Sequence, residues 1–320
     1  MVGNWLAKGG PERRKQIVLA TKVAGYSMAR GYIVDVRRKT LGKEAGLESV
    51  ATRLSKDQIF EACDASLKRL QTEYIDLYQL HWPERYTPNF GALGYKRASE
   101  RGEDVIAVEE QVAAIGSLIK SGKVRYWGLS NENAFGVTTF VHACKKLGVP
   151  LPVSIQNDFA FVDRRFEQDG TAEACSPYNV GGNGIGLLAY GALAGGTLSG
   201  KYSDPEAETG KSRHTLFPTF QPRYHVNATR EMAAQFAAVA RKHGFAPAQL
   251  ALAWAAGREY MGSVIIGATT MEQLEENLAA FDLKIPEDCA AELEALYLKY
   301  ERPYFAHSGR MGREEKRQKT

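Results

Sequence analysis

Six polar side chains of this sequence stand at the ends of apolar runs, where α/β proteins with parallel strands place their reactive groups. They are Lys22, His81, Ser130, Asn131, Gln156 and Tyr190. The Lys22 ammonium is costly to bury unless a partner or a catalytic task compensates it. A lysine at a strand end can also attack a carbonyl carbon to form a Schiff base. Six polar groups at successive strand ends would converge on one mouth, which a purely structural role does not predict.

Each of these residues also has a structural explanation when it is taken alone. Lys22 could form a buried salt bridge, and His81 could be a hydrogen-bonded core histidine. The hydroxyl and amide residues could cap the helices that follow, and Tyr190 could pack in the core. The prediction of a site therefore depends on the whole set.

Six runs rich in Val, Ile, Leu and Tyr predict six strands with helices between them. The predicted strands are Gln16–Val23, Ile75–Trp82, Val124–Asn131, Val153–Phe159, Gly186–Leu193 and Ser263–Thr269. The predicted helices are Val108–Ser121, Phe135–Leu147, Ala228–His243, Pro247–Arg258 and Met271–Ala280. A further helix begins after Ser55, whose spacing from Gln58 is that of a capping box. Strands that are apolar throughout and alternate with helices indicate parallel βαβ units.

Two architectures are built from such units, an open doubly wound sheet and a closed eight-stranded barrel. No GxGxxG turn follows any predicted strand, which counts against the open sheet. The barrel is favoured, although the predicted strands are two too few for it. Residues 2–8 look like the end of a helix before the first predicted strand. We predict one barrel domain over residues 1–305 and a basic, disordered tail over residues 306–320.

Composition and charge exclude several classes of protein. The chain is 44% hydrophobic and 24% charged, as in soluble globular proteins, and no apolar run is long enough to span a membrane. Residues 306–320 hold five Lys or Arg against two Glu, so they supply +3 of the net charge of +4. The nearly neutral body argues against a nucleic-acid surface. The four cysteines are far apart, without a CxxC pair, so neither disulfides nor a metal site are indicated. We predict a cytoplasmic protein, or an organellar one if a targeting segment precedes Met1.

Five segments together resemble the aldo-keto reductase family, most closely its Tas-like branch, which is also similar to potassium-channel β subunits. They are residues 2–8 (VGNWLAK), 66–83 (SLKRLQTEYIDLYQLHWP), 122–133 (GKVRYWGLSNEN), 188–202 (LAYGALAGGTLSGKY) and 267–277 (GATTMEQLEEN). The resemblance runs from Val2 to about Ala280. It implies a (β/α)8 TIM barrel of the NADP-dependent oxidoreductase type. In that family NADPH binds across the mouth of the barrel and transfers a hydride to an aldehyde or ketone.

The resemblance also assigns roles to individual residues. Lys22 matches the catalytic lysine, which together with an aspartate lowers the pKa of a catalytic tyrosine, and His81 matches the histidine that orients the substrate carbonyl. Residues that match the cofactor site are Ser130, Asn131, Gln156 and Tyr190 at the nicotinamide, Leu193, Ala194, Gly196 and Lys201 at the pyrophosphate, and Gly267, Thr269, Gln273, Glu276 and Asn277 at the adenosine end. Many members carry a basic residue where this chain has Thr269, so both NADP and NAD stay open.

The family's first two βα units have no counterpart in this sequence, and its catalytic Asp and Tyr lie in that part. We therefore expect a barrel that lacks its first two units and an impaired reductase activity. The alternative is a non-catalytic, redox-sensing NADP(H)-binding protein, because the cofactor residues are present while the catalytic set is incomplete. A Schiff-base enzyme that uses Lys22 is a third hypothesis, but it leaves Tyr190 and Gln156 unexplained.

Two long loops, Gly25–Leu54 and Glu84–Ala107, follow the strands that end in Lys22 and His81, so we expect them to form the walls of a substrate site. Trp82, with the loop aromatics Tyr86, Phe90 and Tyr95, predicts an apolar pocket for a small carbonyl compound. Arg30, Arg37, Arg38 and Lys39 either attract an anionic substrate or belong to a solvated loop. We expect a monomer or a weak homo-oligomer.

Overall fold

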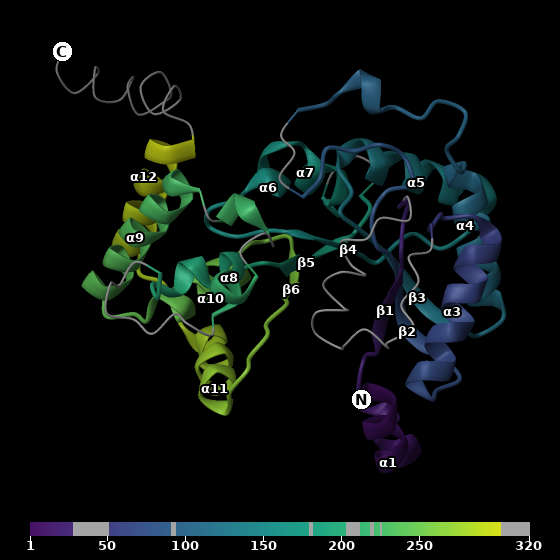
Figure 1. The fold of residues 1–320 in the computed structure, drawn as a ribbon, viewed down its shortest axis with the longest axis horizontal. Coiled ribbons are helices and arrows are strands. Elements are labelled where there is room, and N and C mark those ends of the chain that lie inside the picture. The colour runs from purple at the N-terminus through teal and green to yellow at the C-terminus, as the bar shows by residue number, and fades with distance from the viewer. Residues whose placement is uncertain are drawn as a thin grey trace. The chain divides into compact units, whose positions relative to one another are not determined.

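The computed structural model describes residues 1–27, 51–90, 94–178, 182–202, 212–217, 221–224 and 226–301. Their contacts divide them into two compact units, coloured along the chain in Figure 1. Unit 1 contains residues 1–157 and 167–186. Unit 2 contains residues 158–166 and the described residues from 187 onward. The predicted basic tail lies outside the described residues, and the single barrel domain over residues 1–305 stays a prediction.

Strands and helices alternate along unit 1 (Figure 1). Its strands are β1 (Ala20–Val23), β2 (Ile75–Leu80), β3 (Val124–Ser130) and β4 (Ser154–Asp158), whose last residue belongs to unit 2. Its helices are α1 (Val2–Lys15), α3 (Lys56–Leu70), α4 (Val108–Lys120), α5 (Ala134–Leu147), α7 (Thr171–Cys175) and the short η1 (Arg97–Ser99), while α6 (Arg165–Gln168) crosses the boundary in sequence. β1 pairs with β2, β2 with β3 and β3 with β4, each time in parallel. The predicted parallel α/β class is therefore confirmed.

The amino-terminal helix shortens the first predicted strand. α1 continues to Lys15, with a break at Gly10 (φ +64°), and β1 begins only at Ala20 instead of Gln16. Arg14 near the end of α1 forms a buried salt bridge of 2.6 Å with Asp76 at the start of β2. The same carboxylate accepts a hydrogen bond from the backbone N–H of Leu19 at 3.0 Å. This contact holds α1 and the start of β1 against β2.

The helices of unit 1 bury one face each against the strands. Ile59 and Cys63 on α3, Ile115 on α4 and Phe140 on α5 are almost fully buried, at the helical spacing that the sequence predicts. Trp127 of β3 is fully buried and packs edge-on against Phe140, with ring centroids 6.0 Å apart. These contacts form a core that fixes the strand ends in place.

The start of α3 differs in detail from the predicted capping box. The Ser55 hydroxyl accepts a hydrogen bond from the backbone N–H of Gln58, as predicted. The Gln58 side chain, however, accepts from the backbone N–H of Arg53 at 2.5 Å, and no hydrogen bond to Ser55 N–H is found for it in the described part of the chain. The loop before α3 bends so that the backbone N–H of Arg53, two residues before Ser55, reaches the side-chain oxygen of Gln58.

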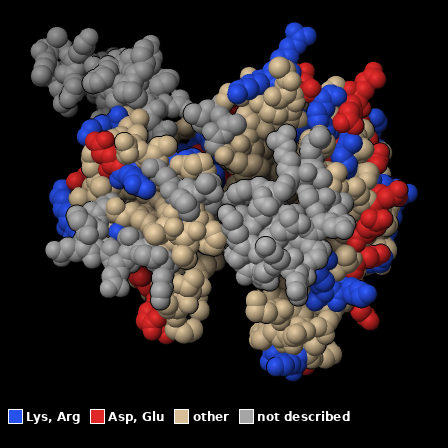
Figure 2. Space-filling view, in the orientation of Figure 1, with Lys and Arg blue, Asp and Glu red and all other residues tan. Residues whose placement is uncertain are grey.

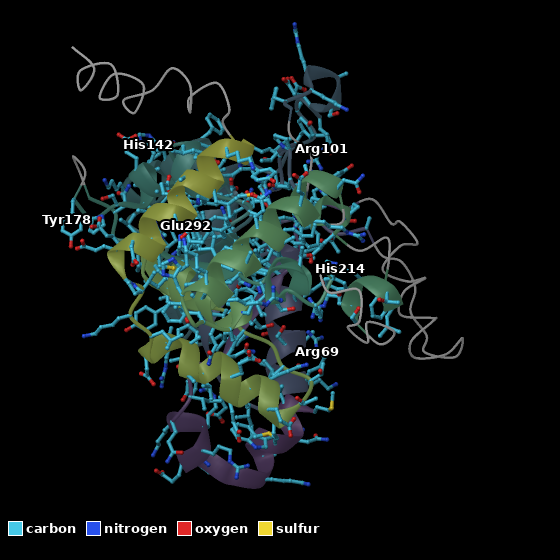
Figure 3. All side chains as sticks on the ribbon, turned by 90° about the vertical axis from the view of Figure 1, so that its left-hand side faces the viewer. Arg69, Arg101, His142, Tyr178, His214 and Glu292 are labelled. Atoms are coloured by element: carbon cyan, nitrogen blue, oxygen red, sulfur yellow. The ribbon has the colours of Figure 1, made fainter. Side chains whose placement is uncertain are left out.

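Unit 2 contains strands β5 (Gly186–Tyr190, whose first residue belongs to unit 1) and β6 (Met261–Val264), which are parallel. Its helices are α8 (Arg213–Leu216), α9 (Asn227–Lys242), α10 (Pro247–Ala256), α11 (Met271–Ala279), α12 (Glu287–Glu301) and the short η2 (Ala194–Ser199), η3 (Pro222–Tyr224) and η4 (Ala280–Asp282). None of the predicted helices covers α12. Figure 3 labels Glu292, a residue of this helix. Its carboxylate accepts a hydrogen bond of 2.7 Å from the ammonium of Lys242, the last residue of α9.

An aromatic cluster forms the core of unit 2. The Phe159 ring stacks on Trp254 of α10 at 5.4 Å, and Phe161 packs against Phe236 of α9 at 4.7 Å. Three strand boundaries of this unit differ from prediction. β5 ends at Tyr190 instead of Leu193, because Gly191 turns the chain with φ +76°. β6 begins at Met261 instead of Ser263 and ends at Val264 instead of Thr269.

The surface charge, the cysteines and the length of the helices bear on the expectations from composition. Acidic and basic side chains are interspersed on the right-hand face in Figure 2, the side on which Figure 1 draws α3 and α4. All four cysteines are buried free thiols. Among the described residues, no helix is long and apolar enough to cross a membrane.

Candidate functional site

Strand register places the polar residues of unit 1 on one face of the strands. Lys22 is paired with Gln79, and Ser130 with Gln156. Paired residues of neighbouring strands point to the same side, as do residues two apart in one strand. His81 lies two residues beyond Gln79, and its backbone N–H donates to the carbonyl oxygen of Val23 at 2.9 Å. The Lys22 and His81 side chains therefore emerge side by side at the carboxyl ends of β1 and β2.

Partial burial lowers the pKa of both side chains. Burial lowers the pKa of the Lys22 ammonium, because a charged group is poorly solvated there. The pKa of His81 falls to about 4, first because of burial and second because the Lys22 charge repels a second cation. His81 is thus a neutral imidazole at pH 7. No carboxylate among the described residues lies within ion-pair distance of Lys22, so a structural salt bridge does not explain its burial there.

Ser130, Asn131 and Gln156 come together at the ends of β3 and β4. The Ser130 hydroxyl donates to the carbonyl oxygen of Gln156 at 2.7 Å. The Asn131 Nδ2 donates to the carbonyl oxygen of His81 at 2.7 Å and to the Ser130 hydroxyl at 3.1 Å. Both Nδ2 hydrogens of Asn131 are therefore used inside the protein.

Trp82 lies beside His81, with ring centroids 4.6 Å apart. Its indole N–H donates to the carbonyl oxygen of Tyr26 at 2.7 Å, which fixes the ring. Phe90 approaches the Trp82 ring edge-on at 6.5 Å, and its own side chain is 55% exposed. Tyr86 and Tyr95 pack against each other at 5.4 Å. The predicted aromatic residues thus form two pairs, of which the Trp82 pair adjoins His81.

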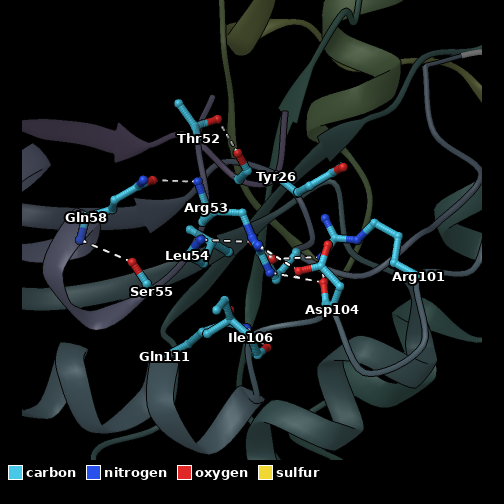
Figure 4. A network of polar contacts seen from close by, with 12 residues as sticks. Tyr26, Thr52, Arg53, Leu54, Ser55, Gln58, Arg101, Asp104, Ile106 and Gln111 are labelled. Atoms are coloured by element: carbon cyan, nitrogen blue, oxygen red, sulfur yellow. Dashed lines mark hydrogen bonds and ion pairs between the residues drawn. The ribbon is translucent and has the colours of Figure 1, made fainter. Parts of the chain in front are cut away.

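A buried ion-pair network joins the two loops that follow β1 and β2 (Figure 4). The Glu84 side chain is only 1% exposed and accepts hydrogen bonds from Arg53 at 2.6 Å and from Arg101 at 2.8 Å. Arg101 also lies over the Tyr26 ring, 3.3 Å from its centroid. Ser27 and Thr52 exchange two backbone hydrogen bonds of 2.9 Å. The network fixes both ends of the first loop, whereas residues 28–50, with Arg30, Arg37, Arg38 and Lys39, lie outside the described residues.

In unit 2, Tyr190 lies at the end of β5 near a buried acid. Burial raises the pKa of Tyr190, and the Asp158 carboxylate raises it further. Asp158 accepts hydrogen bonds from Arg223 at 2.9 Å and from the Tyr224 hydroxyl at 2.5 Å. Burial raises the pKa of Asp158 in spite of the attraction of Arg223. The backbone carbonyl of Tyr190 accepts a hydrogen bond of 3.0 Å from the N–H of Phe159, the residue after Asp158. This backbone hydrogen bond holds Tyr190 and Asp158 close to each other.

The loop after β5 combines left-handed backbone with a lysine. Ala194, Gly195 and Gly196 all have positive φ, of +49°, +66° and +101°. A side chain at Gly196 would lie 3.0 Å from the Lys201 ammonium nitrogen. Leu193 precedes this turn, and its carbonyl oxygen accepts from the Gly196 N–H at 2.8 Å. The loop can therefore bring backbone and one cation close to an anion.

The last predicted group gathers at the start of α11. Thr270 caps the helix by accepting from the Gln273 N–H, and the Gln273 side chain accepts from the backbone N–H of Thr269 at 3.0 Å. Gly267 and Thr269 lie in the loop after β6, not in a strand as predicted. The exposed members of the group are Gly267, Thr269, Gln273 and Glu276, while Asn277 is buried.

Two features escaped the sequence analysis. Gln79, which is paired with Lys22 on the neighbouring strand, is 1% exposed. Its amide nitrogen has no hydrogen-bond partner among the described residues. A glutamine inside an apolar strand was a usable signal for it. The contact of Asp158 with Arg223 and Tyr224 had no such signal, because about 65 residues separate its partners in the chain.

These observations define an α/β protein with parallel strands and polar residues at successive strand ends. The model of the aldo/keto reductase family matches residues 1–298, and the chain belongs to that family. It is 39% identical to Protein tas of Escherichia coli (strain K12) over 302 residues, which are 94% of this chain and 80% of that protein. It is 34% identical to an aldo-keto reductase of Babesia bovis, covering 90% of this chain and 98% of that one. A putative voltage-gated potassium channel subunit beta of Schizosaccharomyces pombe is 31% identical, over 72% of this chain and 61% of that protein.

Proposed function

We propose that this member of an oxidoreductase family reduces small aldehydes or ketones to alcohols with NADPH, within a (β/α)8-type fold. The observation that carries the proposal is the pair of half-buried side chains at adjacent strand ends, Lys22 and His81. The Lys22 ammonium has no described carboxylate partner, and His81 is neutral at pH 7. Such a pair suits a carbonyl oxygen on which negative charge develops.

The residues proposed for the cofactor fit its chemistry. The Ser130 hydroxyl, the Asn131 Oδ1 and Gln156 offer mixed donors and acceptors for a carboxamide. The left-handed turn at Gly196 and the Lys201 ammonium suit a pyrophosphate. The amino end of α11, where Thr269 lies, suits a 2'-phosphate. When bound, NADPH supplies the hydride.

The chain's own residues would act on the carbonyl oxygen. Neutral His81 can donate its N–H to that oxygen and orient it. The positive Lys22 stabilises the charge that develops there. The alkoxide left by hydride transfer would take its proton from water. Because none of the residues proposed here acts as the acid, we expect turnover to be slower by roughly the 10² to 10⁴ that acid catalysis contributes. Trp82 would contact the substrate beside His81.

One observation favours a second candidate, a non-catalytic NADP(H)-binding protein. Three relatives carry the name of a voltage-gated potassium channel subunit beta. We also propose a cytoplasmic location, in keeping with the free thiols.

The test is titration of the full chain with NADPH and NADH, followed by a panel of aldehydes and ketones. We expect saturable NADPH binding and slow, aldehyde-dependent oxidation. Lys22→Met should abolish the oxidation and leave the NADPH dissociation constant within about twofold, whereas Lys8→Met, on the exposed face of α1, should change neither. Binding without turnover in the parent chain would support the second candidate. A borohydride-trapped adduct on Lys22 would instead support the Schiff-base hypothesis.

A further inference from the structure

The turn that follows β3 is held in a conformation that most residues avoid. Asn131 has φ +55°, in the left-handed region that asparagine tolerates better than most side chains. Its backbone N–H donates to the Gln156 carbonyl at 3.1 Å. The backbone carbonyl oxygen of Asn131 accepts a hydrogen bond of 2.9 Å from the Nδ2 of Asn89. Asn89 belongs to the loop after β2, so this loop fastens the turn from outside.

The next residue, Glu132, is held by the same loop. Its side chain is 3% exposed, and both oxygens accept from Arg85, at 2.8 and 2.7 Å. Arg85 also donates to the Oδ1 of Asn133 at 3.2 Å, and that oxygen caps α5 by accepting from the Gly136 N–H. The Glu132 carbonyl accepts from the Asn157 Nδ2 at 2.7 Å. The turn is thus bonded to two neighbouring segments and to the first turn of α5.

The chain leaves room for this ion pair. A Cβ atom at Gly136 would lie 1.8 Å from a Glu132 oxygen and 2.7 Å from an Arg85 nitrogen. Those distances are far below van der Waals contact, so a side chain at this position would displace the Glu132 carboxylate or the Arg85 guanidinium. A buried carboxylate is tolerated because the bidentate guanidinium compensates its lost hydration.

We propose that Arg85 and Asn89 are positioning residues for the nicotinamide end of NADP(H), acting through the Asn131 turn. The inference rests on the proposed function, which assigns Ser130 and Asn131 to the nicotinamide carboxamide. Binding groups work only when neighbouring contacts hold them within a fraction of an ångström. Arg85 and Asn89 follow His81 in the chain, so the segment that leaves the carbonyl-binding residue also fixes the cofactor-binding turn.

The experiment compares two ligands, NADPH and 2'-phospho-ADP, which lacks the nicotinamide. Asn89→Ala removes one hydrogen bond to the turn from a half-buried position and should leave the fold intact. We expect it to raise the NADPH dissociation constant about 3- to 10-fold and to change that of 2'-phospho-ADP less than twofold. Asn183→Ala is the matched control. Its Nδ2 donates to the Ala174 carbonyl at 2.8 Å, before the amino end of β5, and its loss should change neither constant.

A second pair of variants tests the buried acid. Glu132→Gln should weaken NADPH binding at least as much as Asn89→Ala and again spare 2'-phospho-ADP. Asp76→Asn removes a similarly buried, arginine-bound carboxylate at the opposite end of β2 and should lower stability alone. An equal loss for both ligands, or no loss of NADPH affinity in either variant, would overturn the inference. Failure of the parent chain to bind NADPH would instead overturn the proposed function and the inference with it.

Discussion

At the scale of single residues, burial decides which protonation states the proposed site uses. Burial and the charge of the neighbouring Lys22 ammonium both lower the pKa of His81 and keep its imidazole neutral. A neutral imidazole can donate one hydrogen bond while it accepts another, which suits a carbonyl ligand. An exposed histidine would be partly charged near pH 7 and would compete with Lys22 for the same negative charge.

The lowered pKa of His81 makes stability depend on pH. Its pKa is about 4 in the folded chain and near 6.5 when unfolded, so the unfolded state binds more protons between these values. The free energy of unfolding should therefore fall as pH drops from about 6.5 to about 4. Urea unfolding at pH 7.5 and pH 5 should show a loss on the order of 2 kcal/mol that His81→Gln abolishes. His142→Gln, at an exposed position on α5, should retain the loss, and an equal loss in both variants would contradict the assignment.

A substitution at Gly191 tests how tightly the buried Asp158 of unit 2 constrains the turn after β5. It has φ +76°, and a Cβ there would lie 2.4 Å from an Asp158 oxygen and 2.9 Å from the Tyr224 hydroxyl. Gly191→Ala should cost about 2 to 4 kcal/mol of unfolding free energy, from backbone strain and overpacking together. Gly148→Ala has the same kind of strain, at φ +63°, but meets no atom within 4 Å and should cost about 1 kcal/mol. Chemical denaturation measures both, and equal costs would show that the Asp158 contact does not constrain the turn.

At the scale of elements, the strands could be predicted where apolarity was continuous. β2 is buried along its whole length, and its predicted start at Ile75 is correct. β1 and β6 are four residues long and partly exposed, so their predicted bounds were wrong by several residues. α12 was missed although Cys289, Leu293 and Tyr297 are buried at helical spacing. Local pattern therefore indicated the order of elements better than their ends.

The cap of α3 gives the prediction at this scale. Ser55→Ala removes the side-chain acceptor for the Gln58 N–H and should lower the unfolding free energy by about 1 kcal/mol. Ser117 lies exposed within α4, where its hydroxyl donates to the carbonyl oxygen of Ala113 in the preceding turn. Ser117→Ala should be neutral or slightly stabilising, since alanine is the better helix former. Denaturant midpoints of the two variants provide the comparison, and indistinguishable midpoints would argue against the cap.

At the scale of the whole molecule, the family could be recognised from five segments, and the match over residues 1–298 confirms it. The register that sets Lys22 beside His81 followed from parallel pairing of runs already visible in the sequence. The contacts that hold the site could not be foreseen. Arg85 meets Glu132 across 47 residues, and Arg223 meets Asp158 across 65, because loop paths and not local pattern decide such contacts.

The most direct test of the proposed function follows the hydride itself. The full chain is incubated with NADPH deuterated at both C4 positions of the nicotinamide and with an aromatic aldehyde, and the alcohol is analysed by mass spectrometry. We predict one deuterium on the carbinol carbon, formed slowly by the parent chain and by Lys8→Met, and not formed by Lys22→Met. Alcohol without deuterium, or bound NADPH that yields no alcohol after prolonged incubation, would contradict carbonyl reduction by this chain.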